Sequence, residues 1–263
     1  MHLLQLLFFI KQPLPSLSMT WIIASFCVSV IAGCHWLAGM VAARPEREQQ
    51  RWASLGGGAG VAYVFLHLLP ELAIGGKALS ATPGMQTFAT TPVIEALLFL
   101  VALLGVAFFF SMDVISNQYK KSNSMVALIH GLAFALINYL YAYTLPSLIT
   151  TGRLYGLLFT VAISAHVLVA DRTMARHHPR VYRRRFRWLG TTAVAVGYAH
   201  AALLHPISDF TLAIATAFLG GGLLISVFRE EIPSPSSTRL WWFLSGLGMM
   251  TILLLMALSL YHH

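Results

Sequence analysis

The most chemically suggestive stretch of this chain is an apolar segment, residues 56–72, whose far end carries a histidine, a proline and a carboxylate. His67 and Glu71 are four residues apart, so on a helix they share one face. Pro70 has no N–H, which leaves the carbonyl of Leu66 without its usual helical partner. One short piece of helix therefore offers an imidazole, a carboxylate and a free backbone oxygen, which suit a divalent metal ion.

Two further residues extend this group. Glu95 and His200 fall near the same ends of apolar stretches, and with His67 and Glu71 they form a candidate outer metal site. Ionisable residues in apolar segments are costly in lipid and point by default to a function. For Glu95, contact with water and lipid headgroups is the simpler explanation.

A second group of ionisable residues falls at the opposite ends of the apolar stretches. His166 is followed five residues later by Asp171, and His130 in the preceding stretch lies at a similar depth if the two stretches are antiparallel neighbours. A two-histidine site with Asp113 or Asp171 is one interpretation. Histidines that hydrogen-bond to backbone carbonyls or hydroxyls inside a helix bundle are the other, and His35 belongs to the same group.

The composition identifies the elements that must position these residues. Of the 263 residues, 57% are hydrophobic and 10% are charged, whereas soluble domains have about 45–50% and about 25%. The chain is therefore an integral membrane protein. A membrane span needs about 20 mostly apolar residues, and eight stretches qualify, at residues 20–42, 53–74, 93–116, 125–145, 153–171, 188–204, 211–228 and 240–260. Seven spans are the alternative if residues 188–204 lie only partly in the bilayer.

The basic residues predict an orientation. With eight spans, 14 of the 17 Lys and Arg residues fall on one side, and only Lys11, Lys77 and Arg153 fall on the other. Cytoplasmic loops carry the excess of basic residues, so we expect both termini outside the cytoplasm. The densest basic run, residues 171–187, is interpreted as a loop that faces anionic headgroups and sets this topology, rather than as a nucleic-acid site.

Other features bound the function. Cys27 and Cys34 are seven apart on one predicted helix, too far for a disulfide. No nucleophile with an adjacent base and no phosphate-binding loop is visible, so we do not expect an enzyme. Residues 1–18 are predicted to be an extension, with Met19 as an alternative start, and residues 19–263 to form a single transmembrane domain.

Two glycine triplets suggest an internal repeat. Residues 56–58 lead to Pro70 and Glu71, and residues 220–222 lead to an acidic and proline-containing segment at 230–233, on a span that runs in the opposite direction. An inverted repeat produces such pairs, and transporters often place broken or kinked helices around the substrate path. Close helix packing is the alternative explanation for the glycines.

These residues resemble the ZIP (Zrt/Irt-like) family of divalent metal transporters, whose second helix ends in a phrase like residues 65–71. The similarity extends to residues 91–92 and the span after them, and to residues 218–233 and 243–246, which resemble the seventh and eighth helices. The resemblance implies an all-α bundle of about eight membrane-spanning helices with an inverted repeat. It also implies transport of zinc or a similar divalent ion across the cell membrane toward the cytoplasm, either down its gradient or coupled to protons.

The central metal site of that family is only partly matched. The fourth-helix pattern keeps Asn138, and the fifth-helix pattern keeps His166 and an acidic group at Asp171, so the inner candidate site comprises these residues with His130 and Asp113. Two functions follow: a metal transporter with a degenerate central site, or a non-transporting relative that acts as a sensor or interaction scaffold. The expected partners are the lipid bilayer and the metal ion as substrate. A homodimer does not follow from the apolar faces, because lipid covers them.

Overall fold

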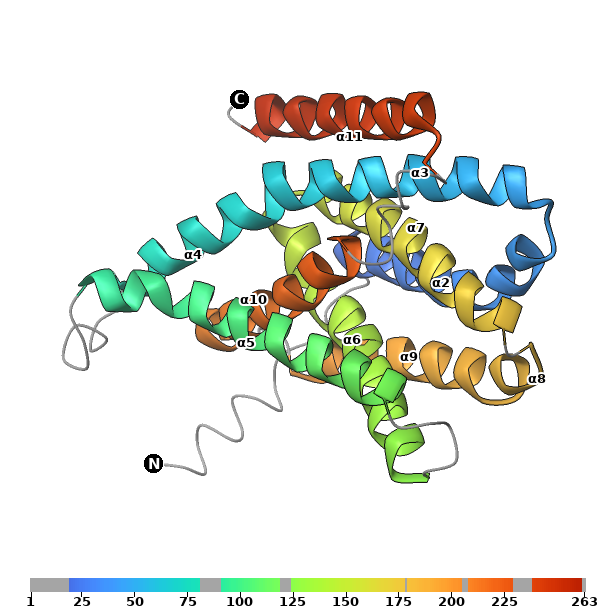
Figure 1. Ribbon diagram of the computed structural model, residues 1–263. Helices are drawn as coiled ribbons and strands as arrows, with labels where there is room; N and C mark the ends of the chain where they lie inside the picture. Colours follow the sequence, from blue (N-terminus) through green and yellow to red (C-terminus); the bar gives the residue numbers. More distant parts are fainter. Residues whose placement is uncertain are drawn as a thin grey trace.

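The computed structural model describes residues 19–80, 91–118, 124–177, 179–204, 208–228 and 238–261. Within these ranges the protein is all-helical and contains no strand (Figure 1). The predicted extension, residues 1–18, lies outside the described residues.

A helix is present at each of the eight positions where the sequence contains a long apolar stretch. In chain order the elements are α2 (Met19–Ala42), α3 (Glu46–Tyr63), the π-helical turn η1 (Val64–Leu68), α4 (Leu69–Ser80), α5 (Thr91–Gln118), α6 (Ser124–Thr151), α7 (Arg153–His177), the short α8 (Pro179–Val181), the π-helical turn η3 (Tyr182–Phe186), α9 (Arg187–Leu203), α10 (Asp209–Ser226) and α11 (Leu240–Tyr261).

Seven of the described helical segments are long and apolar enough to cross a bilayer, as a multi-pass integral membrane protein requires. The eighth, α9, has 17 residues, which at 1.5 Å per residue spans about 25 Å against a hydrocarbon core of about 30 Å. The choice between seven and eight spans therefore concerns α9, as the sequence indicated.

One expectation about local structure is wrong. The basic segment 171–187 is not an open loop, because α7 continues to His177 and helical structure resumes at Pro179. Arg184 and Arg185 are exposed, whereas Tyr182 between the basic residues is buried. Tyr182 therefore belongs to the protein core although charged residues surround it in the sequence.

Helices α3 and α11 pack side by side (Figure 1), with backbone against backbone. A Cβ atom added to Gly58 would lie 2.0 Å from the carbonyl oxygen of Phe243, and one added to Gly246 would lie 2.0 Å from that of Leu55. Only glycine leaves room for so close an approach, so these two glycines allow the backbones of the two helices to touch.

Helices α5 and α10 pack in the same way. A Cβ atom on Gly221 would lie 1.9 Å from the carbonyl oxygen of Ala102, and one on Gly105 would lie 2.3 Å from that of Phe218. The remaining extensive contacts join α2 with α7 and α6 with α9. Close helix packing, the alternative explanation for the glycine triplets, is thus observed at Gly58 of the first triplet and Gly221 of the second.

The centre of the bundle is formed mainly by α2, α6, α7 and the inner faces of α3 and α10. Ile31, Tyr141 and Ile163 are among its fully buried large side chains. Cys27 and Cys34 are both buried and free, in agreement with the expectation that they form no disulfide. The outer faces of α5 and α11 expose leucine, phenylalanine and methionine side chains, as surfaces in contact with lipid do.

Candidate functional site

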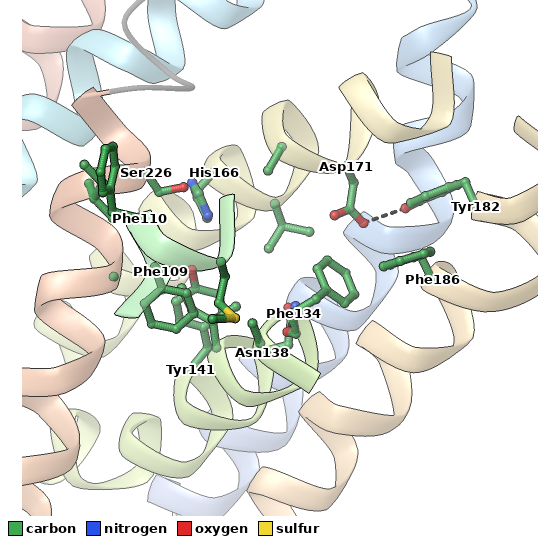
Figure 2. A pocket seen from close by; sticks show the side chains of 17 residues that line it. Phe109, Phe110, Phe134, Asn138, Tyr141, His166, Asp171, Tyr182, Phe186 and Ser226 are labelled. Atoms are coloured by element: carbon green, nitrogen blue, oxygen red, sulfur yellow. Dashed lines mark hydrogen bonds between the residues drawn. The ribbon is translucent and has the colours of Figure 1, made fainter. Parts of the chain in front are cut away.

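A cavity of about 190 Å³ lies between α5, α6, α7, η3 and α10 (Figure 2). Its wall is rich in aromatic side chains, among them Phe109, Phe110, Phe134 and Phe186. The polar residues that line it are Asn138, Tyr141, His166, Asp171, Tyr182 and Ser226. An apolar chamber with a few converging polar groups is the usual form of a binding site.

Three residues of the predicted inner site line this cavity. Asn138 comes from α6, and His166 and Asp171 come from α7. All three side chains are buried, and the ring of His166 lies 6.1 Å from that of Tyr141, centroid to centroid. The side chains of His130 and Asp113, on α6 and α5, lie outside the described residues.

A histidine of α2 joins two of these groups. The Nδ1 atom of His35 lies 2.5 Å from Oδ2 of Asp171, and its Nε2 atom lies 3.1 Å from Oδ1 of Asn138. His35 is fully buried. It connects α2, α6 and α7 at one level of the bundle. The sequence groups His35 with the inner ionisable residues but does not predict that Asp171 and Asn138 are its partners.

The hydrogen bonds define the protons of this cluster. The Nδ2 group of Asn138 donates to the carbonyl of Phe134 at 2.9 Å, which leaves Oδ1 to accept a hydrogen bond from Nε2–H of His35. The short contact between Nδ1 and Asp171 needs a second proton, because both atoms otherwise present lone pairs. The His35 and Asp171 pair therefore carries no net charge.

Tyr182 completes the cluster from the segment that the sequence treated as a loop. Its hydroxyl lies 2.5 Å from Oδ2 of Asp171, a contact that Figure 2 marks. The same hydroxyl lies 2.6 Å from the carbonyl oxygen of His35. Burial, followed by the nearby Asp171 carboxylate, raises the pKa of the Tyr182 phenol well above its usual value, so the hydroxyl stays a donor. In the sequence, an aromatic residue among arginines is the signal for this role, and Phe186 in the same run gives that signal too.

Gly190 on α9 makes room for the imidazole of His35. A Cβ atom at this position would lie 2.5 Å from Cε1 and 2.6 Å from Nε2 of the ring. Real Cβ atoms do not approach so closely, so the ring occupies the space that any larger residue would fill. Helix α9 thus makes room for the cluster by having glycine at this position.

The polar groups of the cavity include donor atoms of the types that bind metal ions. Imidazole nitrogen and carboxylate and amide oxygen suit zinc or another first-row divalent ion. Among the described residues, however, no three His, Cys, Asp or Glu side chains gather closely enough to hold one. The donor types at the cavity fit such an ion, but the described donors are fewer than a closed tetrahedral site uses.

The predicted outer pair lies at a second, much smaller cavity. His67 and Glu71 both line a space of about 20 Å³ together with Thr144 and Thr216, enough for about one water molecule. The ring of His67 stacks on Tyr155, with 5.1 Å between the centroids and 14° between the planes. The two residues therefore point into the bundle rather than into lipid.

Pro70 follows directly on a π-helical turn. The N–H of Leu69 donates to the carbonyl oxygen of Val64, five residues back, and Pro70 itself is exposed in the first turn of α4. Because a widened turn absorbs one extra residue, the helix continues past the proline. Such turns are frequent at functional sites, and this one contains His67.

The other two outer residues do not join this pair. His200 is exposed near the end of α9, where its Nδ1 atom hydrogen-bonds with the hydroxyl of Tyr139, and it lines neither cavity. The side chain of Glu95 on α5 lies outside the described residues.

The buried cluster, the aromatic cavity and the small outer cavity are thus the features on which a function can be argued. A comparison of the chain with models of known protein families and with curated proteins finds no match, so the residues themselves carry the argument.

Proposed function

We propose that this protein is a membrane transporter with a ZIP-like architecture, whose substrate is a divalent metal ion such as zinc and whose substrate path includes the aromatic cavity. The observation that carries the proposal is that Asn138, His166 and Asp171 line one interior cavity from two neighbouring helices. They bring nitrogen and oxygen ligands to a place shielded from lipid. Transport toward the cytoplasm follows from the family resemblance and is part of the proposal.

We infer a two-fold internal repeat, which would support a transporter. The glycine contacts of α3 with α11 match those of α10 with α5. In α3, Gly58 lies three residues after Leu55, whose carbonyl contacts the partner helix, and in α10, Gly221 lies three residues after Phe218, whose carbonyl does the same. An offset of 163 residues relates the two halves at four positions: Leu55 and Phe218, Gly58 and Gly221, Val64 and Val227, and Pro70 and Pro233.

Two of the π-helical segments are related by the same offset. The turn η1 begins at Val64, and π-helical structure also begins at Val227, directly after α10. The N–H of each valine approaches the carbonyls three and four residues before it. The next residues, Phe65 and Phe228, contact each other with 6.4 Å between ring centroids. Equivalent residues that touch are expected beside a two-fold axis.

The helix pairing also supports the repeat. In such a repeat the equivalent helices are α2 and α9, α3 with α4 and α10, α5 and α11, and α6 and α7. The contact of α3 with α11 is then equivalent to that of α10 with α5, and the contact of α2 with α7 is equivalent to that of α9 with α6. Transporters built from two such halves place the substrate where the halves meet and alternate its access between the two sides.

A second candidate function is a non-transporting sensor or interaction scaffold. It is favoured by the fact that Oδ2 of Asp171 already binds both His35 and Tyr182. A carboxylate oxygen with two partners is stabilised without a metal ion. In this case the cluster would only hold α2, α7 and η3 together.

Uptake by proteoliposomes separates the two functions. Purified protein would be tested with zinc, manganese and iron, comparing the wild type with His166→Ala and with a matched control, His200→Ala, whose side chain lies away from both cavities. We expect uptake above that of empty vesicles, a loss of about tenfold for His166→Ala, as one lost ligand of about 1.4 kcal/mol would produce, and little change for His200→Ala.

Two results would contradict the proposal. Uptake that His166→Ala leaves unchanged would remove the cavity from the path, and no uptake of any of the three ions would favour the scaffold. A thermal shift on adding zinc gives an independent measure of binding, because a ligand of the folded state raises the melting temperature. The shift should be present in the wild type and His200→Ala and reduced in His166→Ala.

A further inference from the structure

A third hollow, of about 330 Å³, lies where α3 and α11 begin and is separate from both cavities described above. Arg47 and Arg51 of α3 line it on one side, and Arg239, Trp241 and Trp242 line it on the other. Arg47 and Arg51 are one helical turn apart, so they share a face of α3.

The hollow is held in shape by contacts between the two helices. The backbone N–H of Arg239 donates to Oγ of Ser54 at 3.0 Å, which fixes the start of α11 against α3. The guanidinium of Arg51 lies 5.8 Å from the ring centroid of Trp242, which in turn lies 6.2 Å from that of Trp52. The side chain of Arg51 and the backbone of Arg239 are thus held in place where they line the hollow.

The charge of this site is unbalanced. Three arginines line it, no Asp or Glu is among its lining residues, and none of the three forms an ion pair within the described part of the chain. Like charges that converge repel one another unless an anion lies between them. The first turn of α11 faces the same hollow, and the N–H groups of a helix start also favour an anion.

The surroundings indicate which anion. Trp241 is 78% exposed and Trp52 is 58% exposed, and exposed tryptophans at helix ends are typical of the level of the lipid headgroups. Arg47, Arg51 and Arg239 belong to the basic majority that predicts the cytoplasmic side, where anionic lipids give the membrane a negative surface. Guanidinium groups bind phosphate oxygens in pairs.

We propose that this hollow binds the phosphodiester headgroup of an anionic phospholipid, with Arg47, Arg51 and Arg239 as its ligands and the tryptophans beside its glycerol and upper acyl chains. The site joins the first turns of α3 and α11. It does not depend on the proposed transport function, because none of its residues lines either cavity.

Native mass spectrometry of the purified full chain tests the proposal, with phosphatidylglycerol and phosphatidylcholine as competing probes. We expect the wild type to retain phosphatidylglycerol over phosphatidylcholine by about tenfold, and Arg51→Gln/Arg239→Gln to lose that preference, since each arginine near an anionic surface contributes a few-fold. The matched control is Arg184→Gln/Arg185→Gln, which removes the same charge from exposed arginines elsewhere and should retain the preference.

Three outcomes would overturn the proposal. They are equal retention of the two lipids by the wild type, an equal loss in both double variants, and retention that Arg51→Gln/Arg239→Gln does not change. If that variant does not fold, Arg51→Lys/Arg239→Lys keeps the charge and should weaken the preference without abolishing it. Inorganic phosphate at millimolar concentration is the remaining arm: if it displaces the lipid completely, the site binds free phosphate rather than a membrane component.

Discussion

Nδ1 of His35 lies 2.5 Å from Oδ2 of Asp171, so a single contact joins the first described helix, α2, to the C-terminal part of α7. Both side chains are almost fully buried, at 0% and 3% exposure. The pair carries no net charge, which makes it tolerable in the membrane interior, but neither partner is tolerable there alone.

His35→Ala should therefore destabilise the protein strongly. Removing one member of a buried pair leaves the other without compensation, at a cost of about 3–5 kcal/mol. The melting temperature in detergent, followed by the exposure of Cys27 and Cys34 to a thiol-reactive dye, measures the effect, because both thiols are buried in the folded protein. His200→Ala, at an exposed residue, should change it little, and equal melting temperatures for the two variants would contradict the role given to His35.

Tyr182→Phe removes only the hydroxyl that bonds to Asp171 and to the carbonyl of His35. We expect a loss of about 1–3 kcal/mol, since a buried acceptor loses its donor. The pKa of the phenol is raised in the folded protein, so its stabilising effect is fully present below the unfolded value of about 10 and is lost only as the pH rises beyond it. The difference in melting temperature between wild type and variant should stay constant from pH 6 to pH 9, and a difference that disappears within this range would show that the hydroxyl ionises there.

Gly190→Ala tests the space that α9 leaves for the imidazole. The new methyl would lie 2.5 Å from the ring of His35, so the ring or the helix must move, at a cost of about 1–3 kcal/mol. Gly33→Ala on α2 is the matched control, because no atom lies within 4 Å of its added Cβ, and alanine in an open helical position stabilises by about 0.5–1 kcal/mol. Opposite signs of the two changes in thermal stability are expected, and a harmless Gly190→Ala would mean that the ring is not confined.

Gly246→Ala and Gly248→Ala compare two glycines of α11 that are two residues apart. A Cβ on Gly246 would lie 2.0 Å from the carbonyl oxygen of Leu55, whereas one on Gly248 meets nothing within 4 Å. Only the first substitution should lower the melting temperature, because it pushes α11 away from α3. Similar effects of the two substitutions would contradict the backbone contact between these helices.

The helices were predictable because membrane spans leave a strong one-dimensional signal. All eight apolar stretches coincide with helices, with differences confined to their ends. The helical structure around Tyr182 does not follow from the sequence, because a dense run of charge is typical of a solvent-exposed loop. Tyr182 is nevertheless buried between arginines that are exposed. Orientation of the termini remains a prediction from the distribution of Lys and Arg.

The candidate site was predictable only in part. Asn138 was proposed through the family resemblance, whereas His166 and Asp171 stand out already as ionisable residues in an apolar stretch. The shared cavity agrees with these proposals without testing them as a metal site. The partnership of His35 with Asp171 joins residues 136 positions apart, and no local pattern specifies such a contact. The sequence also could not predict that His200 lies apart from His67. Both residues lie at the ends of apolar stretches, and the sequence does not show which helices are neighbours.

The backbone contacts at glycine have a mechanical consequence. Helices that meet atom to atom along their main chains cannot slide past each other without breaking that fit, so α3 with α11, and α5 with α10, would each move as one rigid body. If the protein transports as proposed, the change that opens the aromatic cavity to one side and then to the other would occur where these two rigid pairs meet α6 and α7. The rings of Phe65 in η1 and Phe228 after α10 contact each other between the two pairs, so their packing would have to change if one pair moved against the other.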